Sequence, residues 1–187
     1  MSWSSSRPSP MFSSATVRSL LLTPLVVAFV GASRQAHAQE AGIAVGTHAP
    51  AAAVALLDGT PADLAHYIGK KPVVLEFWAT WCPLCRKLEI PLQAARERYG
   101  ERVTFVSVGV NSNQTADKQR AYATDRHIGG LFVFDRDGKA VAAYKAPHTS
   151  YLVVINGDGT VVYAGVGADQ DVEAAVSKAF AMGHASF

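Results

Sequence analysis

The chain has 187 residues and a formal charge near neutrality, with 17 Lys and Arg against 15 Asp and Glu. Three arginines, Arg7, Arg18 and Arg34, lie in the first 38 positions, where there are no acidic residues. Without that segment the balance becomes 14 basic against 15 acidic side chains. The basic excess therefore belongs to the N-terminal segment, and we expect no nucleic-acid-binding surface. The rest of the chain has the length of one domain with a single core.

The N-terminal segment has the pattern of an export signal. Two arginines precede an apolar run at residues 20–30, and Ala36-His37-Ala38 follows as a small-x-small cleavage sequence. The run is shorter than the roughly 20 residues that a membrane span needs, so a membrane anchor is the less favoured reading. We predict a cleaved signal peptide at 1–38, a domain at 39–187, and a periplasmic or other extracytoplasmic location.

The first half of the domain begins with short elements. Residues 53–57 and the following turn predict a strand or hairpin, and residues 61–67 predict a brief helical turn. Residues 73–78 form a nearly continuous apolar run, which is typical of a strand buried on both faces. An apolar stripe at helical spacing then predicts a helix over 83–99, with a kink at Pro91.

The second half continues the alternation of strands and helices. The predicted elements are a strand at 103–110, a helix at 116–126, a strand at 131–134, a hairpin of 151–155 with 161–164, and a helix at 170–182. Alternation followed by a hairpin predicts an α/β fold with a central mixed sheet flanked by helices.

The only two cysteines, Cys82 and Cys85, are separated by two residues. A disulfide that closes so short a loop removes little entropy from the unfolded chain, so redox chemistry or metal binding explains the pair better than a structural role. Pro83 suits the first position of a helix. Cys82 would then lie at a helix N-terminus, where free N–H groups and the helix dipole favour a thiolate.

This placement suggests different roles for the two thiols. Cys85 follows one turn later on the same side of the helix and is expected to be more buried and less acidic. We therefore predict that Cys82 attacks a substrate disulfide and that Cys85 resolves the mixed disulfide.

Glu76 is an acidic residue inside the otherwise apolar strand at 73–78. Burial would raise the pKa of its carboxyl group, because burial disfavours the charged form. Such a group could take a proton from Cys85, directly or through a water molecule. The alternative is an edge position from which Glu76 points to solvent.

The run Phe77-Trp78-Ala79-Thr80-Trp81-Cys82-Pro83-Leu84-Cys85 resembles the active-site motif of the thioredoxin superfamily. The lead-in at 46–50 and 69–74 resembles that of the exported TlpA-like, redoxin branch. The resemblance covers about residues 43–183. It implies a thioredoxin-like fold with an N-terminal hairpin extension and a central insertion. It also implies that Cys82 is the nucleophile, that Cys85 resolves, and that Glu76 is the assisting buried acid.

Two positions depart from the family pattern. The family's helix proline comes five residues after the second cysteine, where this chain has Ile90 followed by Pro91. The family also places a cis-proline beside the nucleophile. Counting back from Asp158-Gly159 puts Ser150 there, and Pro147 comes three residues early unless the loop is longer.

The substrate-binding residues follow from the same resemblance. We expect the backbone at Thr149 and Ser150 to face Cys82, and Trp81 and Pro83 to complete the substrate-binding surface. Trp81 is expected to be about half exposed.

A copper-binding module is the alternative. His148 and the residues after it resemble the loop of Sco-type copper chaperones, which bind copper through two cysteines and a histidine. Cys82, Cys85 and His148 would be a donor set suited to copper. The Sco-type cysteines are separated by three residues, however, and these by two.

The favoured hypothesis is an exported thiol–disulfide oxidoreductase without cofactor or metal. Leu84 offers neither charge nor hydrogen bond to stabilise a thiolate strongly, which favours the reducing direction. The expected partners are disulfides in exported proteins, of the cytochrome c or copper-site assembly type, and an upstream thiol electron donor, either soluble or membrane-bound. We expect a monomer.

Overall fold

The computed structural model describes residues 42–181, which belong to one compact unit. The predicted signal peptide, its cleavage site, and the predicted end of the last helix at Met182 lie outside the described residues. Those boundaries stay predictions. None of the helices within 42–181 is long and apolar enough to span a bilayer.

Seven strands form one mixed sheet in the order β2-β1-β5-β4-β3-β6-β7. The strands are β1 (Ala53–Leu56), β2 (Pro61–Asp63), β3 (Val73–Trp78), β4 (Thr104–Val110), β5 (Leu131–Asp135), β6 (Tyr151–Ile155) and β7 (Val161–Val166). The three central strands β3, β4 and β5 are parallel, and β6, β7, β1 and β2 extend the sheet in antiparallel fashion. The sheet thus has the mixed character predicted from the sequence.

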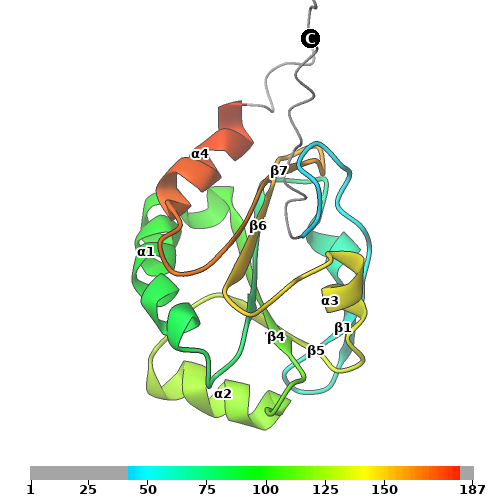
Figure 1. Ribbon diagram of the computed structural model, residues 1–187, viewed down its shortest axis with the longest axis vertical. Coiled ribbons are helices and arrows are strands. Elements are labelled where there is room, and N and C mark those ends of the chain that lie inside the picture. Colours follow the sequence, from blue (N-terminus) through cyan, green and yellow to red (C-terminus); the bar gives the residue numbers. More distant parts are fainter. Residues whose placement is uncertain (1–41, 182–187) are drawn as a thin grey trace, which may run out of the picture. The chain divides into compact units, whose positions relative to one another are not determined.

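Four α-helices pack against this sheet: α1 (Pro83–Tyr99), α2 (Ala116–Asp125), α3 (Lys139–Ala143) and α4 (Val172–Ala181). Two short 3₁₀ helices, η1 (Leu64–Tyr67) and η2 (Gly100–Arg102), join them. Helices α1, α2 and α4 lie on one side of the sheet, and α3 lies on the other (Figure 1). Helix α2 packs closely against β4 at Gly109, which has no Cβ. A Cβ at this position would collide with the side chain of Gln119 on α2.

Two hydrophobic clusters lie largely on opposite faces of the sheet, and Trp78 joins the cluster of Phe77 at the end of β3. Side chains alternate along a strand, so Val74, Glu76 and Trp78 face α1 while Phe77 faces the opposite side. The cluster under α1 and α4 includes Val74, Leu88, Leu92 and Val176. The other cluster includes Phe77 and Tyr144, and it also contains both cysteines. Every residue of β3 is buried, as expected for the central strand.

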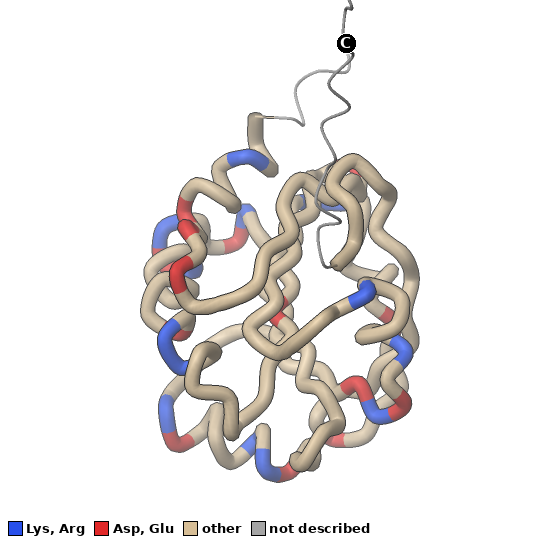
Figure 2. Tube along the Cα trace, in the orientation of Figure 1, with Lys and Arg blue, Asp and Glu red and all other residues tan. Residues whose placement is uncertain are grey.

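Helix α1 leads directly from the cysteine pair and is continuous through Pro91. Its C-terminal end is tied to α4 by Tyr99, whose hydroxyl donates to Glu173 Oε1 at 2.7 Å, and by the ion pair of Arg98 with Glu173. Acidic and basic residues are interspersed along the helices (Figure 2). The described surface therefore presents charges of both signs.

The N-terminal hairpin is confirmed, but its second strand was predicted as a helical turn. Pro61–Asp63 pairs with β1, and the helical turn begins only at Leu64, where Asp63 Oδ1 accepts a hydrogen bond from Ala65 N–H. Proline is tolerated here because it begins an edge strand. Helix α3 was not predicted, since its five residues are too short to show a period. It lies in the α2–β5–α3 segment between β4 and β6, the place of the expected central insertion.

Candidate active site

Cys82 and Cys85 form a disulfide at the N-terminus of α1. Cys82 is the N-cap residue, and its Sγ accepts a hydrogen bond from the backbone N–H of Cys85 at 3.1 Å. Pro83 occupies the first turn, as predicted, where its missing N–H costs no helical hydrogen bond. Strand β3 ends at Trp78, so the cysteine pair that follows lies at the carboxyl edge of the sheet.

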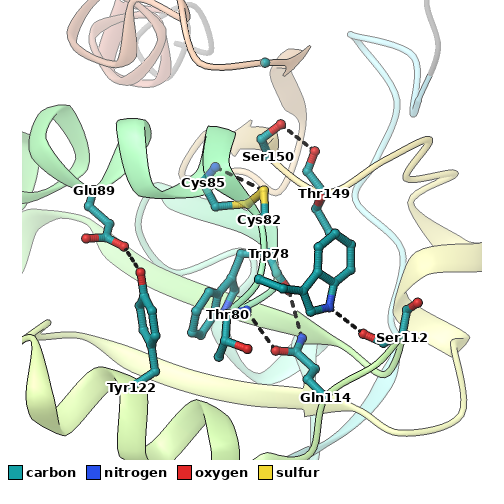
Figure 3. The surroundings of a disulfide bond; sticks show 12 residues. Trp78, Thr80, Cys82, Cys85, Glu89, Ser112, Gln114, Tyr122, Thr149 and Ser150 are labelled. Carbon is teal, nitrogen blue, oxygen red and sulfur yellow. Dashed lines mark hydrogen bonds between the residues drawn. A yellow bond between two sulfur atoms is a disulfide. The ribbon is translucent and has the colours of Figure 1, made fainter.

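The expectation that Cys85 is more buried than Cys82 is wrong. Cys82 is 2% exposed and Cys85 is 3% exposed, and both belong to one core cluster. The disulfide holds both sulfur atoms against the protein interior (Figure 3). Their difference therefore lies in their place on the helix rather than in their burial, because only Cys82 caps the helix N-terminus.

The exposed surface at the pair comes from its neighbours. Trp81 is 45% exposed, as predicted, Leu84 is 41% exposed, and Pro83 is also exposed. The indole Nε1 of Trp81 donates to the carbonyl oxygen of Ser112 at 2.8 Å, which fixes the ring in place. These side chains form an apolar rim around a buried disulfide.

Gln114 holds the loop that connects β3 to α1. Its Oε1 accepts a hydrogen bond from Thr80 N–H at 3.0 Å, and its Nε2 donates to the carbonyl oxygens of Trp78 at 3.2 Å and Val110 at 2.5 Å. The side chain is buried. One amide thus satisfies three backbone groups and ties the cysteine-bearing loop to the end of β4 (Figure 3).

Glu76 is 7% exposed and faces α1, so the solvent-facing alternative is wrong. Burial raises the pKa of its carboxyl group to about 7, and the negative charge of Glu89 adds to the rise, while the positive charge of Arg96 opposes it. Glu76 and Cys85 line the same cavity of about 10 Å³, together with Ser107. That volume holds about one water molecule.

Glu89 has different partners from those its position on α1 suggests. Arg86 lies three residues earlier on the helix, at the spacing of an i,i+3 ion pair. Instead, the carboxylate accepts a hydrogen bond from the Tyr122 hydroxyl at 2.6 Å and forms an ion pair with Arg126 at 2.7 Å. Burial raises the pKa of Tyr122 to about 12, and the hydrogen bond to Glu89 and the negative charge of Glu89 add to the rise.

The loop before β6 reaches the edge of the sheet where β3 leads into Cys82. Tyr151 lies opposite Phe77, so Ser150 is level with the last residue of β3 (Figure 3). Ser150 is buried, its hydroxyl donates to the carbonyl oxygen of Thr149, and its own carbonyl accepts from Gln170 Nε2 at 3.0 Å.

The backbone of Ser150 has a φ of +61°, in the left-handed region. Proline is locked near −65°, so Ser150, which the count from Asp158-Gly159 places at the family's proline, has a conformation that proline cannot adopt.

His148 is exposed, and no three His, Cys, Asp or Glu side chains within 42–181 are grouped so as to hold a metal ion. The copper alternative gains no support from this arrangement.

Sequence reasoning missed the amides that hold the site, Gln114 and Gln170, and the partners of Glu89. One signal for Gln114 was available, because polar residues 111–114 directly follow the buried strand β4. The carboxyl ends of neighbouring parallel strands meet at one edge of a sheet, where such residues can meet the cysteine loop. Gln170 and Arg126 lie far along the chain from the site residues that they contact, and neither directly follows a buried strand.

Comparison with known proteins gives relatives of similar sequence and solved structures of similar fold. The chain is 33% identical to the thioredoxin-like protein YneN of Bacillus subtilis over 101 residues, which cover 54% of this chain and 59% of that protein. It is also 33% identical to the thiol:disulfide interchange protein DsbE of Escherichia coli over 104 residues, 52% of this chain and 50% of that protein. The chain thus spans about half the length of the relatives that it matches.

Two solved structures match this chain over nearly the whole of their own length. A DsbE-like protein of Chlorobium tepidum has a TM-score of 0.64 at 23% identity, covering 74% of this chain and 97% of that one. A secreted disulfide oxidoreductase of Mycobacterium tuberculosis has a TM-score of 0.57 at 27% identity, covering 69% and 94%. Both confirm the thioredoxin-like fold. The redoxin family model matches residues 44–182, so this chain, with its Cys-x-x-Cys pair at the N-terminus of α1, belongs to the redoxin family of the thioredoxin superfamily.

Proposed function

We propose that this chain is an exported thiol–disulfide oxidoreductase that reduces disulfides in other exported proteins through Cys82 and Cys85. The observation that carries the proposal is the position of Cys82 as N-cap of α1, with a backbone N–H directed at its sulfur. Relatives named as a thiol:disulfide interchange protein and as a soluble secreted antigen support the activity and the exported setting.

The reaction starts from the reduced pair. The Cys82 thiolate attacks one sulfur of a substrate disulfide, forms a mixed disulfide, and releases the first substrate thiolate. Cys85 then loses its proton and attacks the Cys82 sulfur. The Cys82–Cys85 disulfide forms, the second substrate thiolate leaves, and two electrons have passed to the substrate. An upstream thiol donor, soluble or membrane-bound, returns the pair to the reduced state.

Glu76 is the base for the second attack. It lines one small cavity with Cys85, and a pKa of about 7 lets it accept and release a proton near neutral pH. Direct transfer or transfer through a single water molecule would fit this cavity. We expect Glu76→Gln to slow resolution of the mixed disulfide and to leave the first attack by Cys82 unchanged.

The substrate surface consists of the apolar rim at Trp81 and Pro83 together with the loop at Thr149 and Ser150. Because Ser150 is buried and its carbonyl is engaged by Gln170, we assign direct contact with substrate to Thr149 in this loop. A disulfide in another exported protein, such as an apocytochrome or a copper-site assembly protein, would be the substrate that binds this apolar rim.

The reduction potential of the Cys82–Cys85 pair, measured against glutathione, tests the direction. A potential near about −270 mV is expected for a reductant, and one near about −120 mV would reverse the assigned direction. Stopped-flow kinetics of a reduced Cys85→Ser variant tests the mechanism, because this variant should stop at the mixed disulfide. Full release of both substrate thiols by that variant would contradict the roles given to the two cysteines.

A further inference from the structure

We propose that Glu89 is a second carboxylate on the route by which the proton of Cys85 leaves the protein. It would connect the buried cavity at Glu76 to a groove on the surface. This inference rests on the proposed thiol–disulfide exchange and adds a proton-transfer residue to it. A buried base needs such a route, because Glu76 must return to its charged form before each resolution step.

The inner end of the route is the cavity of about 10 Å³. Glu76, Trp78, Cys85, Glu89 and Ser107 bring polar groups to its lining, and Ile128 and Phe132 close the rest. A cavity of that size holds about one water molecule, which needs two to four polar partners. These polar groups meet that need, and the buried indole N–H of Trp78 has no other hydrogen-bond partner in the described structure. Glu89 lies four residues after Cys85 on α1, so the helix places both side chains on the same face.

The outer end of the route is a groove of about 380 Å³ beside α1. Ile90, Gln93 and Glu97 line it, with residues 126–128 on the other side. Glu89 and Ile128 line both this groove and the inner cavity. Of these two residues only Glu89 can carry a proton. Its side chain is 21% exposed, so the carboxylate lies between the protein interior and solvent.

Tyr122 on α2 and Arg126, which directly follows α2, hold the Glu89 carboxylate in this position. The Tyr122 hydroxyl donates to Oε1 at 2.6 Å, and Arg126 donates to Oε2 from Nε at 2.9 Å and from Nη2 at 2.7 Å (Figure 3 shows the tyrosine). These hydrogen bonds fix the carboxylate between the inner cavity and the groove. From this position Glu89 can accept a proton from the cavity and pass it to solvent in the groove.

The groups that face Glu76 come from three elements. Helix α1 contributes Cys85 and the charges of Glu89 and Arg96, β4 places the neutral Ser107 opposite Glu76, and β6 places the apolar Leu152 opposite it. Glu89 is therefore the carboxylate next to Glu76 that also reaches the surface.

The proton then moves in balanced steps. Cys85 gives its proton to the Glu76 carboxylate. Protonated Glu76 passes the proton through the cavity to Glu89, and Glu89 releases it into the groove. The thiolate left on Cys85 then attacks the Cys82 sulfur, the Cys82–Cys85 disulfide forms, and the substrate thiolate leaves.

Resolution can be followed in stopped flow with dithiobisnitrobenzoate, a disulfide that releases a coloured thiol at each of the two steps. Reduced protein should release the second thiol at least about tenfold more slowly in Glu89→Gln, with the first release unchanged. Imidazole, a small diffusible proton carrier, should restore the second step in proportion to its concentration. The pH midpoint of that step should also fall, because the negative charge that raises the pKa of Glu76 is gone.

Two further variants separate proton transfer from structural damage. Glu97→Gln removes a carboxylate that lines the groove but not the cavity, and it should behave like the wild-type protein. Tyr122→Phe removes one hydrogen bond to Glu89 and keeps the carboxylate, so it should retain a resolution rate within about threefold of wild type. A Glu89→Gln protein that resolves at the wild-type rate, or that is slow and insensitive to imidazole, would overturn the inference. Release of only one thiol by the wild-type protein would instead refute the proposed function.

Discussion

The backbone N–H of Cys85 points at the sulfur of Cys82, at an N–S distance of 3.1 Å. The contact arises because Cys82 caps α1, so the first free N–H groups of the helix surround its side chain. The same groups would stabilise a thiolate on Cys82 in the reduced protein. Cys85, inside the first turn, has no equivalent contact from its own helix. This asymmetry supports the assignment of Cys82 as the nucleophile.

The strength of that thiolate should depend on Leu84, which is exposed between the cysteines. We expect Leu84→His to lower the pKa of Cys82 and to make the pair more oxidising, because a positive imidazolium stabilises the reduced form. Each 1.4 kcal/mol of added thiolate stabilisation should raise the potential by about 30 mV. Thiolate absorbance against pH and equilibration with glutathione measure the two quantities. Leu84→Gln, which adds no charge, is the control, and an equal shift in both variants would contradict the argument.

Stability should fall as pH rises through the titration of Glu76. Its pKa is raised in the folded protein from 4.5 to about 7, so the folded state binds more protons than the unfolded state between these values. The stabilisation present below about pH 4.5 is therefore lost as pH approaches and passes 7. A shift of this size corresponds to about 3 kcal/mol.

Glu76→Gln should remove this dependence. Urea unfolding of the oxidised protein should show the variant and the wild type within about 1 kcal/mol of each other at pH 5, and the variant up to about 3 kcal/mol more stable at pH 8. Glu97→Gln changes an exposed carboxylate and should leave the pH dependence as it is in wild type. A wild-type protein whose stability rises from pH 5 to pH 8, with the same slope in Glu76→Gln, would show that Glu76 is not titrating in this window.

Gln114→Ala should loosen the cysteine-bearing loop. The substitution leaves Thr80 N–H and the carbonyls of Trp78 and Val110 without their partner. We expect a loss of about 2–4 kcal/mol in unfolding free energy, because unsatisfied buried groups are costly. Gln93→Ala, on the exposed face of α1, should change stability by less than about 0.5 kcal/mol. Equal effects of the two substitutions would argue against a clamp at Gln114.

Ser150 offers a test of the backbone geometry at the substrate loop. Ser150→Pro should destabilise the protein by at least about 3 kcal/mol, since proline cannot reach a φ of +61°. Ser150→Gly should be neutral or stabilising by about 1 kcal/mol, because glycine adopts this region without strain. Thermal or urea unfolding of both variants gives the answer. A stable Ser150→Pro protein would mean that the loop takes another conformation in solution.

The central strand, the helix after it and the cysteine pair at their junction could all be predicted from the sequence. An apolar run bounded by turns, an apolar stripe at helical spacing and a Cys-x-x-Cys followed at once by proline are local patterns, and local patterns determine local structure. The burial of Glu76 was predictable for the same reason, because its neighbours on β3 are apolar. The five-residue α3 was missed, since so short an element has no measurable period.

The tertiary structure decided which distant residues complete the site. Glu89 pairs with Arg126, 37 positions away, and not with Arg86 on its own helix. Gln114 reaches Thr80 because β3 and β4 end at the same edge of the sheet. The sequence alone determined where the cysteine pair lies, and it predicts Cys82 as the nucleophile. The proposed proton path and the proposed substrate loop depend on packing between elements far apart in the chain, which no local pattern records.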